Sequence, residues 1–176
     1  MISPYIEDQW KTPSWCYRAL EDFIDWKQST VQMLPRLALE PCSGDGRISE
    51  WIQSHGWSCI DNEPQRGGFD YLEYTPEYEY HLIITNPPFS IAEAFVIKAL
   101  SHCKTCCFLL PIRFLATKGR KQLFIDNPLD ALYVLSKRPA FERGPLNKKK
   151  GTDNNEYAWF IWDKQSIFNK HGIVHL

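Results

Sequence analysis

The ten residues HLIITNPPFS, at positions 81–90, decide the fold class and the candidate chemistry of this chain. An apolar, β-branched run that stops at two prolines is typical of a buried strand ending in a rigid turn. Neither proline donates a backbone N–H, and each fixes φ at roughly −65°, so the neighbouring groups are held in a defined geometry. Asn86 adds a carbonyl acceptor and Phe89 a flat ring. These groups suit the binding of a planar group that carries an –NH2, although Asn-Pro is also a common turn dipeptide.

Strand-like and helix-like segments alternate along most of the chain. We expect strands at residues 36–41, 57–60, 81–84, 105–110, 131–135 and 157–162. We expect helices at residues 15–27, 48–54, 91–100 and 117–125. The alternation predicts an α/β fold with a mainly parallel sheet, and the close spacing of the last two strands predicts an antiparallel strand at the C-terminal end.

The composition is that of an ordinary globular domain without a global charge. The chain has 176 residues, of which 44% are hydrophobic and 23% charged, and its net charge is −1. A nucleic-acid partner must therefore meet a local basic patch. No segment approaches the ~18 apolar residues of a membrane span, and the first residues lack a signal-peptide pattern, so we expect a cytoplasmic protein with no membrane partner.

The six cysteines predict neither disulfides nor a metal site. Thiols stay reduced in the cytosol. Cys103, Cys106 and Cys107, with His102 beside them, suggest zinc, but no second pair of ligands follows at a suitable spacing. Because cysteine is among the most buried residue types, we expect these three to lie in the core and expect no metal.

A glycine-containing loop, EPCSGDG at residues 40–46, follows the first predicted strand of the sheet. Gly44 and Gly46 allow a tight turn and a close approach to a ligand, and Glu40 can hold a cationic group. The loop matches neither GxxxxGK[ST] nor GxGxxG, so a phosphate ligand is disfavoured. An ammonium or sulfonium suits it better, although many loops need glycine for structural reasons alone.

Acidic residues follow the second predicted strand. A carboxylate at this position typically accepts hydrogen bonds from ribose hydroxyls, and we assign this role to Asp61, with Glu63 as the alternative. Asp70 is placed where it can meet an adenine amino group. Asp61 and Glu63 are each also typical of a solvated acidic turn.

In this order the motifs resemble those of the S-adenosylmethionine-dependent N6-adenine DNA methyltransferases in which an N-terminal Thr-Pro segment comes first. The resemblance rests on LEPCSGDG at residues 39–46, the acid after the second strand, DYL at 70–72 and NPPF at 86–89. It implies a Rossmann-like class I methyltransferase fold whose mainly parallel seven-stranded sheet has an antiparallel C-terminal strand. It also implies one domain, 1–176, with the Thr-Pro segment and a helix in 1–35 and the core in 36–176.

The resemblance implies S-adenosylmethionine as the cofactor and assigns a role to each site residue. The cofactor would be bound by Thr12, Pro13, Glu40, Ser43, Gly44, Asp61, Asn62 and Asp70. Asn86 and the carbonyl of Pro87 would hold the target amine, Phe89 would stack on the base, and Phe141 would lie beside it. Two acceptors pulling on both N–H bonds favour a tetrahedral nitrogen whose lone pair points at the methyl group.

The chain departs from the sequence-specific members of that family, because we expect a compact form without a separate target-recognition domain. A basic loop, 137–155, contains Phe141, and the electrostatic footprint predicts that it contacts phosphates, although a charge run is also typical of a solvated loop. The contacts would come from Arg138, Lys148, Lys149 and Lys150. We expect DNA more than RNA as the substrate, with a homodimer or a recognition subunit as a source of specificity. An RNA adenine, a protein glutamine amide, or a non-catalytic scaffold remain open alternatives.

Overall fold

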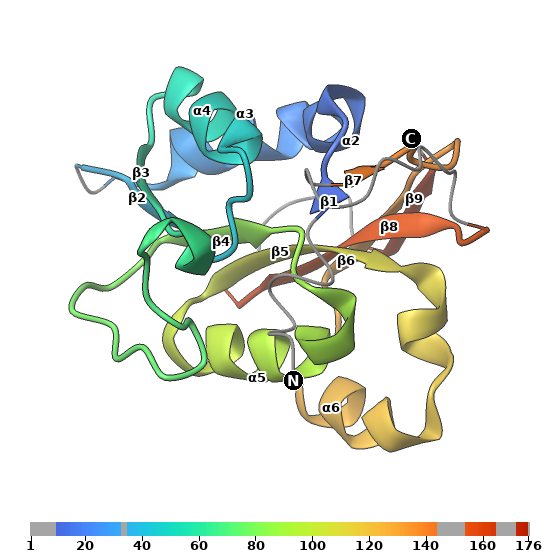
Figure 1. Cartoon of the computed structure of the whole chain (residues 1–176). Coiled ribbons are helices and arrows are strands. Elements are labelled where there is room, and N and C mark those ends of the chain that lie inside the picture. The colour runs from blue at the N-terminus through green and yellow to red at the C-terminus, as the bar shows by residue number, and fades with distance from the viewer. Residues whose placement is uncertain (1–9, 33–34, 144–153, 165–171, 176) are drawn as a thin grey trace.

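A seven-stranded sheet with helices on both faces organises the chain (Figure 1). Its strand order is β3 (Ser58–Asp61), β2 (Leu37–Glu40), β4 (Leu82–Thr85), β5 (Thr105–Pro111), β8 (Tyr157–Asp163), β6 (Ala131–Val134) and β9 (Gly172–His175). Neighbouring strands are parallel, except that β8 is antiparallel to both β5 and β6. This computed structural model describes residues 10–32, 35–143, 154–164 and 172–175.

The α/β class, the mainly parallel sheet and the antiparallel strand near the C-terminus are confirmed. Six strands lie within two residues of the expected runs. The strand β9 was not located from the sequence. It pairs in parallel with β6 at the edge of the sheet, where a short segment needs little apolar pattern of its own.

The N-terminal helix differs from the expected one. In place of one helix over 15–27, the structure has α2 (Ser14–Arg18) and α3 (Glu21–Thr30). The carbonyl of Cys16 would accept the Leu20 N–H in a continuous helix, but it accepts the buried Trp159 indole N–H at 2.7 Å. Leu20 N–H bonds to the Tyr17 carbonyl at 3.0 Å instead. A contact from a distant strand therefore ends α2.

The helices form two layers around the sheet (Figure 1). On one face lie α2, α3 and α4 (Arg47–Ser54), and on the other lie α5 (Ala92–His102) and α6 (Lys121–Asp126). The four residues of β4 are all buried, and Leu82 and Ile84 join one apolar cluster while Ile83 joins the other. A strand covered on both faces needs apolar residues at every position, which explains the continuous run in the sequence.

A second, two-residue ladder ties the N-terminal segment to the later part of the chain. The strands β1 (Trp10–Lys11) and β7 (Glu142–Arg143) pair antiparallel, with Lys11 opposite Glu142. Thr12 is thereby placed near Phe141 in space.

Cys103, Cys106 and Cys107 are buried, as expected. Among the described residues, no group of three or more His, Cys, Asp and Glu side chains could hold a metal ion. No helix within the described ranges is long and apolar enough to cross a membrane.

Candidate functional site

The carboxyl ends of four parallel strands meet at one edge of the sheet. There β2 ends at Glu40, β3 at Asp61, β4 at Thr85 and β5 at Pro111. Glu40 and Asp61 are direct neighbours in the ladder between β2 and β3. In open α/β sheets this edge is where ligands bind. Most of the predicted site residues lie on the loops that leave it.

Asn86 directly follows β4, and its side-chain amide is held by the N-terminal segment. The Nδ2 group donates a hydrogen bond to the hydroxyl of the buried Thr12 at 3.0 Å. The Oδ1 atom is also buried but has no hydrogen-bond partner in the described part of the chain. Leaving a buried acceptor unpaired costs about 1–3 kcal/mol, so such an atom calls for a ligand or another explanation. The amide thus offers an oriented acceptor.

An aromatic cluster follows the two prolines. The half-buried ring of Phe89 lies 5.5 Å from the Tyr157 ring and 6.3 Å, edge to face, from the Phe141 ring, measured between centroids. Phe141 is itself buried and lies 4.9 Å from Tyr157. The structure therefore brings the two predicted base-binding rings together, and it adds Tyr157, which the sequence analysis did not single out.

The glycine loop uses its two glycines for backbone conformation. Gly44 and Gly46 both have positive φ, at 58° and 87°, a region that side chains disfavour. Ser43 N–H donates to the Asn62 carbonyl at 2.9 Å, and Gly44 N–H donates to a Glu63 carboxylate oxygen at 2.8 Å. The loop is thus fixed against the end of β3 before it enters α4.

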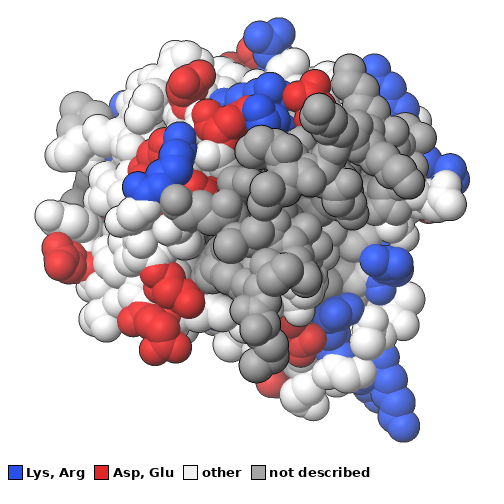
Figure 2. All heavy atoms as spheres, viewed as in Figure 1, with Lys and Arg blue, Asp and Glu red and all other residues white. Residues whose placement is uncertain are grey.

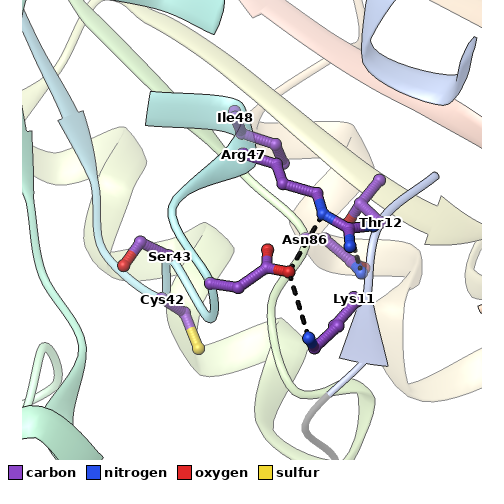
Figure 3. Close-up of a pocket in the computed structure, with 8 residues that line it drawn as sticks. Lys11, Thr12, Cys42, Ser43, Arg47, Ile48 and Asn86 are labelled. Atoms are coloured by element: carbon purple, nitrogen blue, oxygen red, sulfur yellow. Dashed lines mark hydrogen bonds and ion pairs between the residues drawn. The ribbon is translucent and has the colours of Figure 1, made fainter. Parts of the chain in front are cut away.

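A pocket opens between the glycine loop and the N-terminal segment (Figure 3). It is lined by Lys11, Thr12, Cys42, Ser43, Asp45, Arg47, Ile48 and Asn86. Within it, the Asp45 carboxylate pairs with the Lys11 ammonium at 3.4 Å and with the Arg47 guanidinium at 2.9 Å. Charges of both signs therefore surround the space beside Asn86.

Glu40 lies beneath the loop and is fully buried. Its Oε1 accepts the Cys42 N–H at 3.2 Å, and the hydroxyl of the buried Thr85 also interacts with the carboxyl group. Burial raises the pKa of this carboxyl to about 8, and the charges of Asp61 and Glu63 add to the rise. The side chain is therefore poised to lose a proton when a cation approaches.

The two acids after β3 have different surroundings. Asp61 is exposed and lies 3.7 Å from the Arg66 guanidinium. Glu63 is buried, and one of its oxygens holds the Gly44 N–H. Asp61 is therefore accessible to a hydroxyl-bearing ligand, whereas Glu63 supports the loop.

Asn62 and Asp70 serve the local turns. Asn62 donates to the carbonyls of Pro41 and Phe69 and accepts the Phe69 N–H, so its amide joins three segments. An Asp70 carboxylate oxygen accepts the Leu72 N–H at 2.9 Å. Roles for these two residues toward adenine remain predictions. Pro13 precedes α2, and its carbonyl accepts the Cys16 N–H at 3.0 Å.

The predicted phosphate contacts fall partly outside the described residues. Lys148, Lys149 and Lys150 lie there. Arg138 is exposed and pairs with Glu156 at 2.7 Å. Its charge is therefore already compensated by a neighbouring acid.

Sequence reasoning missed the charged members of the pocket. Asp45 and Arg47 flank Gly46 in the loop that the sequence singled out, and Lys11 directly precedes Thr12. Their charge, and their position next to residues already assigned to the site, could have indicated that they line it. The structural role of Glu63 was not visible, because nothing local distinguishes a buried acid from an exposed one.

Comparison with known proteins identifies the fold. No protein-family model and no curated protein matches the sequence. Among solved structures, a type I restriction-modification methyltransferase subunit from Streptococcus thermophilus has a TM-score of 0.65 at 14% identity, over 90% of this chain and 46% of that chain. A candidate RNA methyltransferase from Pyrococcus horikoshii has a TM-score of 0.64 at 13% identity, over 93% and 90% of the two chains.

A third similar structure is a candidate class I S-adenosylmethionine-dependent methyltransferase from Listeria monocytogenes. Its TM-score is 0.62 at 9% identity, over all of this chain and 68% of that one. At these identities the likeness concerns the fold. The chain has the Rossmann-like fold of class I methyltransferases.

Proposed function

We propose that this protein transfers a methyl group from S-adenosylmethionine to the exocyclic N6 amine of adenine in DNA. The observation that carries the proposal is the Asn86 amide, whose donor is bound to Thr12 and whose buried acceptor has no partner in the described chain. A fixed acceptor shielded from water suits an N–H of a ligand. The fold supports the same reaction class, since the similar structures are named as methyltransferases, one of RNA and one a subunit of a type I restriction-modification system.

Residues of the pocket and of the loop around it suit the proposed cofactor. Its amino-acid end carries a carboxylate, for which the pocket offers Lys11 and Arg47, both paired with Asp45. It also carries an ammonium, for which the buried carboxyl of Glu40, beneath the loop and outside the pocket lining, offers an acceptor. Gly44 allows the backbone to approach it, and the exposed carboxylate of Asp61 suits ribose hydroxyls. When bound, S-adenosylmethionine supplies an electrophilic methyl group on a sulfonium.

The residues of the turn would act on the target amine. An adenine amino group is a poor nucleophile because its lone pair is delocalised into the ring. The Oδ1 of Asn86 and the carbonyl of Pro87 each accept one N–H, which favours a tetrahedral nitrogen with its lone pair outside the ring plane. Phe89 holds the base by stacking, and in a duplex the base must first be flipped out. The chain thus contributes position and electrostatics.

The test is transfer of labelled methyl groups to pools of DNA, RNA and protein, followed by analysis of the modified nucleosides or residues. We expect N6-methyladenine in DNA, and a loss of about 10²–10³ in rate for Asn86→Ala, as for removal of one preorganised polar group. Gln53→Ala, at an exposed position of α4, serves as the control. Calorimetry should give an S-adenosylmethionine affinity within a few-fold of wild type for both variants. Label in RNA alone would show that the substrate is RNA and not DNA. Label in none of the three pools would overturn the proposal.

A further inference from the structure

A strongly basic segment outside the site connects β5 to α6. Residues 112–121, IRFLATKGRK, contain four cations and no acid. They form the 3-10 helices η3 (Ile112–Ala116) and η4 (Lys118–Arg120) and the first residue of α6. Arg113, Lys118 and Lys121 are exposed. The side chains of these three residues form no ion pair or hydrogen bond with another residue of the described ranges.

Several cations elsewhere among the described residues have acidic partners. Lys104 pairs with Glu79 at 3.7 Å, and Arg66 and Arg138 also have acidic partners. Figure 2 shows Lys and Arg side chains gathered at the lower right, where Figure 1 places the segment between β5 and α6. Within the described residues, this segment therefore carries three exposed cations without an acidic partner, Arg113, Lys118 and Lys121.

A second pocket joins the basic segment to the candidate site. It is lined by Phe89, Ala92, Leu110, Pro111, Arg113, Phe114 and Arg120. Phe89 belongs to the turn after β4, whereas Leu110 and Pro111 end β5. The pocket thus begins at the predicted base-stacking ring and continues to two arginines.

Arg120 is held rigidly at this pocket. Its Nε donates to Glu93 at 3.0 Å and its Nη1 to the Thr117 hydroxyl at 2.9 Å. Its guanidinium carbon lies 4.1 Å from the centroid of the Phe114 ring. The Nη2 group has no partner among the described residues, so it is available to an anionic oxygen. A guanidinium already fixed by its neighbours loses little freedom when it binds such an oxygen.

We propose that residues 112–121, together with the pocket beside Phe89, bind the sugar–phosphate backbone of the nucleic acid that carries the target base. This inference rests on the proposed function, which places the base on Phe89. Phosphates flank every base, so cations beside the base-binding ring meet them when the base is bound. Arg120 supplies a fixed contact in the pocket, and Arg113, Lys118 and Lys121 supply uncompensated charge around it.

The test compares two charge-reversal double variants. Lys118→Glu/Lys121→Glu alters the basic segment. Lys104→Glu/Lys164→Glu is the matched control, because both lysines lie at the opposite end of the sheet, where Lys164 N–H bonds to the Lys104 carbonyl at 2.9 Å. Binding of labelled duplex DNA, single-stranded DNA and RNA oligonucleotides is measured by fluorescence anisotropy between about 50 and 200 mM salt.

We expect the basic-segment variant to bind nucleic acid at least about tenfold more weakly at low salt. Its slope of log Kd against log salt should fall by about 1–2, since each duplex phosphate contact contributes ~0.9. The control should stay within about twofold of wild type, and both should keep wild-type affinity for S-adenosylmethionine. Arg120→Lys keeps the positive charge but loses the planar guanidinium with its several N–H donors. This variant should also bind nucleic acid more weakly.

The outcomes separate this inference from the proposed function. If the two double variants bind every oligonucleotide equally well, residues 112–121 are not the binding surface, even if the wild-type protein methylates nucleic acid. If the two double variants differ in binding as expected but the wild-type protein transfers no methyl group, the binding surface is supported and the proposed function is overturned.

Discussion

The side-chain amide of Asn86 donates a hydrogen bond of 3.0 Å to the hydroxyl of Thr12, across 74 positions of the chain. Thr12 itself follows β1, which pairs with β7. The orientation of the amide, and so the direction in which its carbonyl accepts, therefore depends on the N-terminal segment. The turn at the end of β4 is incomplete without it.

The hydroxyl of Thr12 is the first point to test. Thr12→Val keeps the shape of the side chain and removes the acceptor of the Asn86 Nδ2 group. We expect the methyl-transfer rate at saturating cofactor and nucleic acid to fall by about tenfold, the equivalent of ~1.4 kcal/mol in the barrier. Thr12→Ser keeps the hydroxyl and should retain most of the rate. A wild-type rate for Thr12→Val would contradict the positioning role.

Glu40 should make the stability of the protein depend on pH. Burial raises the pKa of its carboxyl from 4.5 to about 8. Between these values the folded chain keeps a proton that the unfolded chain releases, so the free energy of unfolding falls as pH rises through this window. Glu40→Gln stays neutral in both states, and its free energy of unfolding should fall less steeply between about pH 5 and pH 8.

Denaturant unfolding at several pH values measures this difference. Glu50→Gln, on the exposed side of α4, is the matched control and should follow the wild-type profile. Parallel profiles for Glu40→Gln and the wild type would argue against a raised pKa.

Two adjacent glycines after β3 should respond differently to alanine. At Gly68 a Cβ would overlap the Asn62 Oδ1 and lie 2.7 Å from the Glu63 carbonyl oxygen, so the turn of Asn62 and Glu63, directly after Asp61, must shift. We expect Gly68→Ala to weaken S-adenosylmethionine binding by about tenfold, or ~1.4 kcal/mol. At Gly67 there is open space but φ is 87°, so Gly67→Ala should cost about 1 kcal/mol of stability and leave Asn62 in place.

Calorimetric titration with S-adenosylmethionine and denaturant unfolding together separate these effects. Equal cofactor affinities for the two alanine variants would show that the Asn62 contact does not shape the site.

A buried ion pair holds α3 against the sheet. The Lys27 ammonium and the Asp163 carboxylate lie 2.8 Å apart, with both side chains almost fully buried. Lys27→Met leaves the carboxylate buried without its cation, so the free energy of unfolding should fall by about 3–5 kcal/mol. Adding Asp163→Asn removes the second charge and should restore part of the loss. Urea denaturation measures both, and a Lys27→Met variant as stable as the wild type would refute the argument.

The parts of the fold set by local pattern could be predicted from the sequence. The run LIIT at residues 82–85 reads as a buried strand because every position is apolar or β-branched, and the prolines after it fix where it ends. The break between α2 and α3 could not be predicted. It depends on the Trp159 indole taking the Cys16 carbonyl, a contact across 143 positions that leaves no local signal.

The candidate site divides in the same way. Asn86, Phe89 and the glycine loop were found because prolines and glycines mark the ends of strands. The buried support from Glu63 and the pairing of Arg138 with Glu156 depend on which segments meet in space. The charge run and its position beside Phe141 predicted phosphate contacts in the loop 137–155, and that prediction stands untested for Lys148, Lys149 and Lys150. The exposed Arg113, Lys118 and Lys121 carried no such signal, because only the structure shows that their side chains have no acidic partner among the described residues.

The pairing of Lys11 with Glu142 affects when the site is completed during protein synthesis. Chains emerge from the ribosome N-terminus first, so β1 has no partner until most of the polypeptide has been made. A nascent chain that ends before Glu142 contains the Asn-Pro-Pro-Phe turn but lacks the ladder that places Thr12 beside Asn86. We therefore expect newly made chains to gain the proposed activity late, after the loops that follow β2 and β3 have folded.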